Sequence, residues 1–202
     1  MAQLESLSQS ILRDRELRGK WLLGGLLLSL PLLNLLVLGY WLRYLRRQAV
    51  GRGPMLPAWQ GWEELLVDSV RMLGIKLAFG VLPVLVGGLL SLLLAGLFHL
   101  LMLDLLAWTI AWVPAMAALA ISPVLFLAAA YAFVRTGDDW RVLLQTHVIL
   151  GLVQRSVPKL IAPTLAFWGL AALGWPLLGF LIFLGFSILI SYYFHVFSQV
   201  WE

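Results

Sequence analysis

The sequence contains no cysteine and few charged residues. Without cysteine the chain has no disulfide, no thiolate nucleophile and no cysteine-ligated metal site. Only 12% of its 202 residues are charged, whereas 62% are hydrophobic and the mean hydropathy is +0.94. Soluble domains have about 25% charged and about 45–50% apolar residues. A water-soluble fold of this length could not bury so much apolar surface, so we expect an integral membrane protein.

The chain also lacks the residue patterns of common catalytic and metal centres. No serine, histidine and carboxylate set indicates a hydrolase, no HExxH spacing indicates a zinc site, and the glycines follow no phosphate-loop pattern. The net charge of +4 does not indicate nucleic acid, because the basic residues flank apolar runs, as they do in proteins that contact anionic lipid. We expect no enzyme activity, metal, cofactor or nucleic-acid partner, and we expect bound lipid.

Apolar runs alternate with polar connections in what we expect to be a single membrane domain. Its segments are a polar, interfacial N-terminal segment (1–20), an apolar segment (21–44), a basic connection (45–76), an apolar hairpin (77–134), a second basic connection (135–159) and a second apolar hairpin (160–202). A membrane span needs about 20 residues, which predicts a turn near residues 98–105 in the first hairpin. The second hairpin has shorter arms and is expected to turn at Gly174-Trp175-Pro176. The pattern predicts an all-α membrane protein with about four to six embedded helices.

Each basic connection contains an amphipathic pattern that is typical of a helix at the level of the lipid headgroups. The apolar face of the first carries Trp59, Trp62, Leu65, Leu66, Val70 and Leu73, and the second begins at Trp140. With the N-terminal segment, this predicts two or three interfacial helices. Each connection joins a basic residue, a glycine turn, a tryptophan and an amphipathic helix to an apolar hairpin, so a two-fold internal repeat is one of the architectures that the sequence allows.

All 14 lysines and arginines fall in three blocks, at residues 13–20, 43–76 and 135–159. Basic residues in short loops favour the cytoplasmic side, which predicts a multi-pass protein of a prokaryotic membrane with its basic loops in the cytoplasm. The first block faces the same side only if residues 21–44 dip into the bilayer and return at Pro31–Asn34. The alternative is one kinked helix that crosses the membrane. The charge pattern favours the re-entrant hairpin, and the length favours the span.

A series of motif residues runs from the first apolar segment into the first basic connection. The series is Pro31-x-x-Asn34, Gly39-Tyr40-x-x-Arg43-x-x-Arg46-Arg47, Leu56-Pro57-x-Trp59-x-x-Trp62 and Asp68. It resembles the prokaryotic membrane family catalogued as domain of unknown function 4013, and weaker similarity extends over most of the chain. Ser69 stands where members usually have glycine, and Gln60-Gly61 where they have an acidic residue. The resemblance implies a multi-span helical protein and implies no activity.

The strongest candidate site is both basic and aromatic. Arginine matches the geometry of phosphate oxygens, and tryptophan favours the membrane interface. The candidate residues for binding a lipid headgroup are Arg43, Arg46, Arg47, Arg52, Trp59 and Trp62. The alternative interpretation is that these residues anchor the topology and bind no defined ligand.

Polar residues inside apolar segments are a second group of candidates, because an ionisable group within the bilayer is costly. The intramembrane candidates are Asn34, His99 and Asp104. A spacing of five residues does not align His99 with Asp104 on a helix, so a solvated turn is the alternative to a proton or cation relay. Neutral imidazole is a common ligand, which makes His99, His147 and His195 weak candidates for a pigment ligand. The expected topology puts His99 across the bilayer from the other two.

Three functional hypotheses follow from these features. The leading one is a non-enzymatic scaffold or accessory subunit that contacts anionic lipid and packs against other membrane proteins or itself. The first alternative is a small solute or ion transporter or channel, because of the interrupted segment at Pro31–Asn34 and of Asp104. The second alternative is a pigment- or cofactor-binding subunit of an energy-converting membrane complex, because of the histidines.

Overall fold

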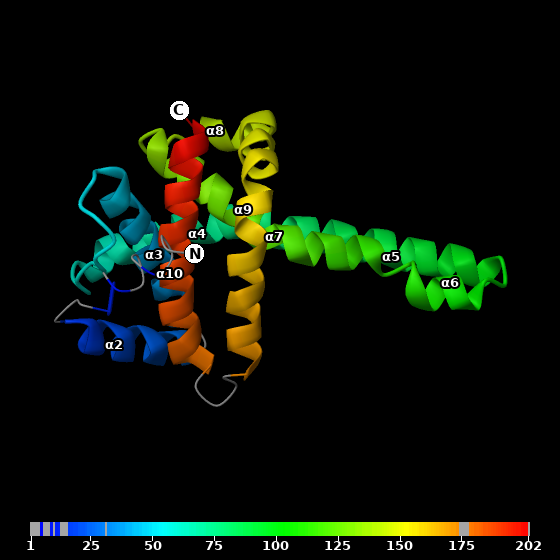
Figure 1. Cartoon of the computed structure of the whole chain (residues 1–202), viewed down its shortest axis with the longest axis horizontal. Helices are drawn as coiled ribbons and strands as arrows, with labels where there is room; N and C mark the ends of the chain where they lie inside the picture. The colour runs from blue at the N-terminus through cyan, green and yellow to red at the C-terminus, as the bar shows by residue number, and fades with distance from the viewer. Residues whose placement is uncertain are drawn as a thin grey trace.

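The computed structural model of the chain describes residues 16–30, 32–173 and 178–201, together with Glu5, Gln9, Ile11 and Leu12. All regular structure in these residues is helical (Figure 1). The elements are α2 (Leu17–Ser29), α3 (Asn34–Ala49), α4 (Trp62–Lys76), the π-helix η1 (Leu77–Val81), α5 (Leu82–Leu100), α6 (Asp104–Thr109), α7 (Val113–Arg135), α8 (Arg141–Leu144), α9 (Thr146–Leu173) and α10 (Leu178–Trp201).

Four helical stretches among the described residues are long and apolar enough to cross a membrane. They are Trp62–Leu100, Asp104–Arg135, Thr146–Phe167 and Gly179–Trp201. The prediction of an all-α membrane fold is therefore confirmed. The two-fold repeat stays a prediction.

Helices α4 and α5 form one continuous helix of 39 residues, joined by the π-turn η1. The sequence pattern predicted an amphipathic helix that lies at the headgroup level and a separate span, whereas the helix runs from one into the other without a turn. Proline has no N–H to donate to the preceding turn, and Pro83 is the second residue after η1. The wider π-turn accommodates the proline ring without ending the helix.

The hairpin of α5, α6 and α7 extends away from the rest of the molecule as an arm (Figure 1). Its two long helices approach closely at Gly87, where an added Cβ would lie 2.5 Å from Ala118 and 2.8 Å from the Pro114 carbonyl oxygen. Ser91 accepts a hydrogen bond of 3.0 Å from the backbone N–H of Ala115. Helix α5 ends at Leu100, within the predicted turn, and the short α6 then packs back against α5.

Helices α9 and α10 form the second hairpin and run across the direction of the arm in Figure 1. The boundary predicted at residue 160 falls inside α9, which spans 28 residues and contains Pro158 and Pro163. Helix α9 is longer than predicted because these prolines do not end it: kinks at proline are tolerated where neighbouring helices support the backbone. Helix α10 spans 24 residues and is also longer than predicted. The predicted turn at Gly174-Trp175-Pro176 lies outside the described residues.

The first apolar segment forms two helices, α2 and α3, with an interruption after Ser29. Leu32 has a φ of 69°, which a helix cannot accommodate. An interruption here was one of the two alternatives that the sequence allowed, the other being one kinked helix, and the re-entrant path through a membrane stays a prediction. Helix α2 lies against α10, and Trp21 donates a 2.9 Å hydrogen bond across this contact to the Phe180 carbonyl.

The core of the body lies between α3, the C-terminal half of α7 and α10. Its largest fully buried side chains include Tyr40, Tyr44, Tyr131, Tyr193 and Phe133. By contrast, α5 buries only Gly87 and Ser91. Within the described part of the chain, most of the arm therefore packs only against its own helices.

Candidate functional site

Helices α3 and α4 pack closely enough for their backbones to approach at Gly39. An added Cβ there would contact the Leu65 carbonyl oxygen and would lie 2.5 Å from the Ser69 hydroxyl and 2.7 Å from the Ser69 backbone nitrogen. The Ser69 hydroxyl donates to the Leu65 carbonyl at 2.7 Å. This crossing places the last turns of α3 beside the middle of α4, and it brings their charged side chains together.

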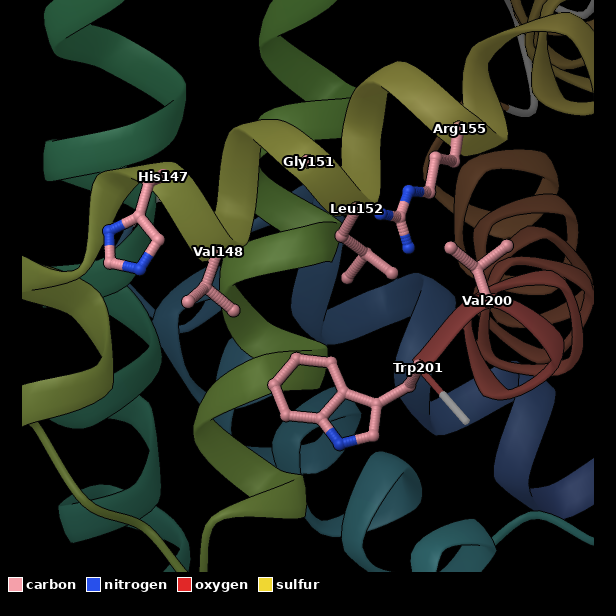
Figure 2. A pocket seen from close by; sticks show the side chains of 7 residues that line it. All are labelled: His147, Val148, Gly151, Leu152, Arg155, Val200 and Trp201. Carbon is pink, nitrogen blue, oxygen red and sulfur yellow. The ribbon is translucent and has the colours of Figure 1, made fainter.

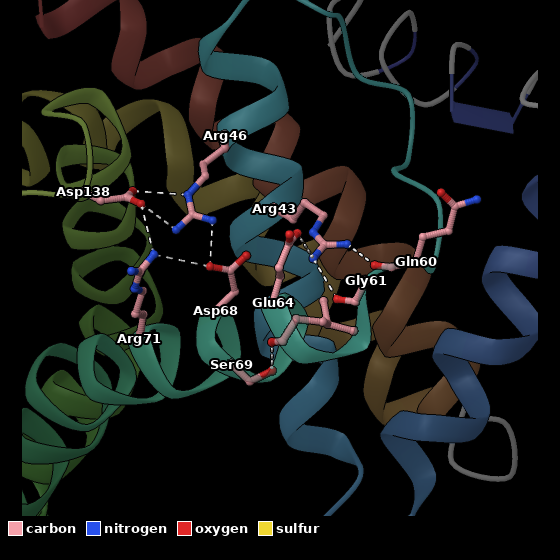
Figure 3. Close-up of polar contacts among 10 residues, drawn as sticks. Arg43, Arg46, Gln60, Gly61, Glu64, Asp68, Ser69, Arg71 and Asp138 are labelled. Atoms are coloured by element: carbon pink, nitrogen blue, oxygen red, sulfur yellow. Dashed lines mark hydrogen bonds and ion pairs between the residues drawn. The ribbon is translucent and has the colours of Figure 1, made fainter.

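Four charged side chains from three segments meet beyond this crossing (Figure 3). We call them the charged cluster: Arg46 from α3, Asp68 and Arg71 from α4, and Asp138 from the turn between α7 and α8. Arg46 donates to Asp68 at 2.7 Å and holds both oxygens of Asp138, at 2.6 and 3.2 Å. Arg71 lies 3.6 Å from Asp68 and 3.5 Å from Asp138.

The electrostatics of the charged cluster suit a structural role. Burial alone would lower the pKa of the Arg46 guanidinium, but its hydrogen bonds to Asp138 and Asp68 outweigh burial and raise that pKa. The Asp68 side chain is only 7% exposed, so these partners offset the free-energy cost of burying it. Two arginines balance two aspartates. The cluster therefore joins α3, α4 and the turn after α7, and it leaves no cation of its own for a ligand.

Arg43 also has partners within the chain. It donates to the carbonyls of Gln60 and Gly61, and its guanidinium lies 3.8 Å from Glu64 (Figure 3). Gly61 has a φ of 64°, the left-handed conformation that glycine adopts readily, and it directly precedes α4. Arg43 thus fixes the loop that begins α4.

Of the other predicted headgroup residues, one packs against the protein and the rest have no ion pair or stay exposed. Trp59 is stacked on Tyr40 with ring centroids 4.1 Å apart, and Trp62 is exposed. Arg47 and Arg52 have no ion-pair partner within the described residues. The structure therefore divides the predicted group, since Arg43 and Arg46 bind protein groups. Headgroup binding by the remaining residues stays a prediction.

Sequence reasoning missed the acidic partners in the charged cluster. Asp68 belongs to the motif series, and Asp138 follows a glycine turn, but the two lie on connections that are far apart in the sequence. The packing of α3 against both α4 and α7 brings them to one arginine. The available signal was that Asp68 belongs to the motif series, whereas the other carboxylates of α4, Glu63 and Glu64, do not.

His99 and Asp104 lie at the tip of the arm. The His99 Nδ1 is 2.8 Å from an Asp104 carboxylate oxygen, although five residues is a poor spacing on one helix. The chain reverses between them, since Met102 has a φ of 56°, and the two side chains are 80% and 65% exposed. Asn34, the third polar candidate, begins α3, and its side chain lines an apolar cavity.

His147 lines a pocket of about 350 Å³ between the start of α9 and the end of α10, beside Arg155 and Trp201 (Figure 2). His195 lies on α10, where its Nε2 is 3.1 Å from the Gln199 amide. His99 is far away, at the tip of the arm. No group of three metal-ligating side chains occurs among the described residues, and a pigment bound to a single histidine stays a prediction.

The fold and these contacts define a polytopic α-helical membrane protein. Residues 22–191 match the family described as "Protein of unknown function (DUF4013)", and because the match covers most of the chain, the protein belongs to this family. Neither the comparison with curated proteins nor the comparison with solved structures gives a match.

Proposed function

We propose that the chain is a non-enzymatic scaffold or accessory subunit that packs against another membrane protein or a second copy of itself. The observation that supports this most directly is the arm. Large apolar side chains along α5 are exposed, among them Leu85, Leu89, Leu92, Leu93 and Leu97. The helices of the arm pack against each other, and their outward-facing apolar side chains are exposed. These side chains can form the surface on which a partner's helices pack.

The outer surface of α5 also offers positions where a partner helix can come close. An added Cβ at Gly88 or Gly96 would meet no atom within 4 Å, so the backbone is accessible at both. Small residues at such positions let membrane helices approach each other. The space beside Gly87, by contrast, is already filled by α7. We further propose that Arg47, Arg52 and Trp62 contact anionic lipid at the cytoplasmic face of a prokaryotic membrane.

Filling the two open glycine positions is expected to remove the partner. The wild-type chain, extracted from its native membrane in a mild detergent, should elute as a particle larger than one chain, with a second membrane protein or a second copy identified by mass spectrometry. The double variant Gly88→Leu with Gly96→Leu should reduce the amount of bound partner at least fivefold, because the leucines block close helix approach. A tenfold change in affinity corresponds to about 1.4 kcal/mol.

Gly169→Leu is the matched control, since Gly169 on α9 also has nothing within 4 Å. It should keep the partner. Recovery of only a single chain, or a solute flux by the isolated protein, would contradict the proposal and favour the transporter. Visible absorbance of the same preparation would favour the pigment-binding alternative.

A further inference from the structure

An open cavity of about 630 Å³ lies at the surface of the body, bounded by parts of α2, α3, α4–η1–α5, α7, α9 and α10, and Asn34 and Lys76 at its edge are exposed. Its walls are predominantly apolar and include the aromatic rings of Trp41, Phe126 and Phe167. Ligand-binding cavities have volumes of about 300–1,000 Å³ and combine apolar walls with a few polar groups that orient the ligand. The size and lining of this cavity match that description.

Two of the polar side chains that line the cavity have no hydrogen-bond or ion-pair partner within the described residues. They are the amide of Asn34, at the start of α3, and the ammonium group of Lys76, at the end of α4. The stem of Lys76 passes over Gly80, where an added Cβ would lie 3.5 Å from its Cγ. Both side chains can donate hydrogen bonds, and Lys76 adds a positive charge.

Lys76 also marks a boundary along the continuous helix. The preceding residues of α4 include Glu63, Glu64, Asp68 and Arg71, and the next ionisable residue after Lys76 is His99. The cavity therefore has a cation where the polar half of the helix ends and apolar walls beyond it. A lipid with an anionic headgroup has the same sequence of polarities: charged oxygens at one end and acyl chain at the other.

We propose that this cavity binds an anionic acyl-chain lipid, with its carboxylate or phosphate oxygens on Lys76 and Asn34 and its chain against Trp41, Phe126 and Phe167. The charged cluster and Arg43 do not take part, because their donors face protein groups. The site is separate from the outer surface of the arm. Partner binding can therefore fail while the lipid site holds, and the reverse is also true.

The test uses the full chain in phosphatidylcholine nanodiscs with traces of three probes that carry a photoreactive acyl chain: oleate, phosphatidylglycerol and phosphatidylcholine. After illumination, mass spectrometry locates the cross-links. A hydrogen bond to a charged group corresponds to about tenfold in affinity. We therefore expect at least one anionic probe to label peptides containing Phe126 or Phe167 about tenfold more strongly than the phosphatidylcholine probe.

Variants separate charge from cavity volume. Lys76→Ala should lower labelling by the anionic probes about tenfold, to the level of phosphatidylcholine. Lys159→Ala, which removes an equal charge from a residue of α9 that does not line the cavity, should leave it unchanged. Val84→Trp, at another position on the cavity wall, should reduce labelling by all probes while keeping the charge.

Stronger labelling by oleate would identify a carboxylate ligand, and stronger labelling by phosphatidylglycerol would identify a phospholipid. Equal labelling by the charged and zwitterionic probes overturns the proposal. So does labelling that Lys76→Ala leaves unchanged, or labelling that Val84→Trp does not reduce.

Discussion

Replacing Gly39 with alanine is expected to destabilise the protein more than any other single-methyl change in α3. The new Cβ would meet the Leu65 carbonyl oxygen and the Ser69 backbone nitrogen, and backbone atoms cannot turn aside as a flexible side chain can. Overpacking of this kind costs about 1–3 kcal/mol, which corresponds to a fall in Tm of about 3–10 °C for a chain of this size. Thermal unfolding in detergent, followed by tryptophan fluorescence, measures the shift.

Gly19→Ala is the matched control for Gly39→Ala. Gly19 lies on α2 with nothing within 4 Å of an added Cβ, so the only effect expected is the gain in helix propensity of about 0.5–1 kcal/mol. The Tm should stay the same or rise slightly. An unchanged Tm in Gly39→Ala would show that α4 can move away from α3 at little cost.

Removing the Asp68 carboxylate is expected to cause the second large loss of stability. Asp68→Ala leaves Arg46 and Arg71 with Asp138 as their only acidic partner in the charged cluster. Breaking a buried ion pair costs about 3–5 kcal/mol, but the Arg46 side chain is 29% exposed and water offsets part of that cost. We therefore expect a loss of about 2–3 kcal/mol in the free energy of unfolding.

Two further variants show whether the charged cluster acts as a unit. Glu63→Ala removes an exposed carboxylate from the first turn of the same helix and should change the free energy of unfolding by less than about 1 kcal/mol. Asp68→Ala combined with Asp138→Ala should cost less than the sum of the two single losses, because both act through Arg46. Simple additivity would show that the carboxylates act independently.

Local features of the sequence were sufficient to predict the class of fold. Apolar runs longer than a bilayer span predicted the two hairpins, and the turn after Leu100 lies where the first run becomes polar. An interruption before Asn34 was one of the two alternatives for residues 21–44, because proline disfavours a continuing helix. These predictions hold because each depends on neighbouring residues and on the solvent that surrounds them.

Tertiary contacts were beyond the reach of the same reasoning. Arg46 was predicted to face lipid phosphate, but its partner Asp138 is 92 residues away in the sequence. The continuity of α4 and α5 depends on a π-turn that has no sequence pattern of its own. The cavity beside Lys76 depends on how several helices from both halves of the chain meet, and its polar residues are unremarkable when taken singly.

The unbroken path from α4 to α5 makes this segment a lever. At about 1.5 Å per residue, the 24 residues from η1 to the tip extend about 36 Å. The charged cluster holds the short end, on α4, and the arm is the long end. A tilt of about 10° at η1 would displace the tip by about 6 Å over that length. The charged cluster therefore fixes the direction of the arm, and a partner that binds the tip exerts a torque on the contacts of the cluster.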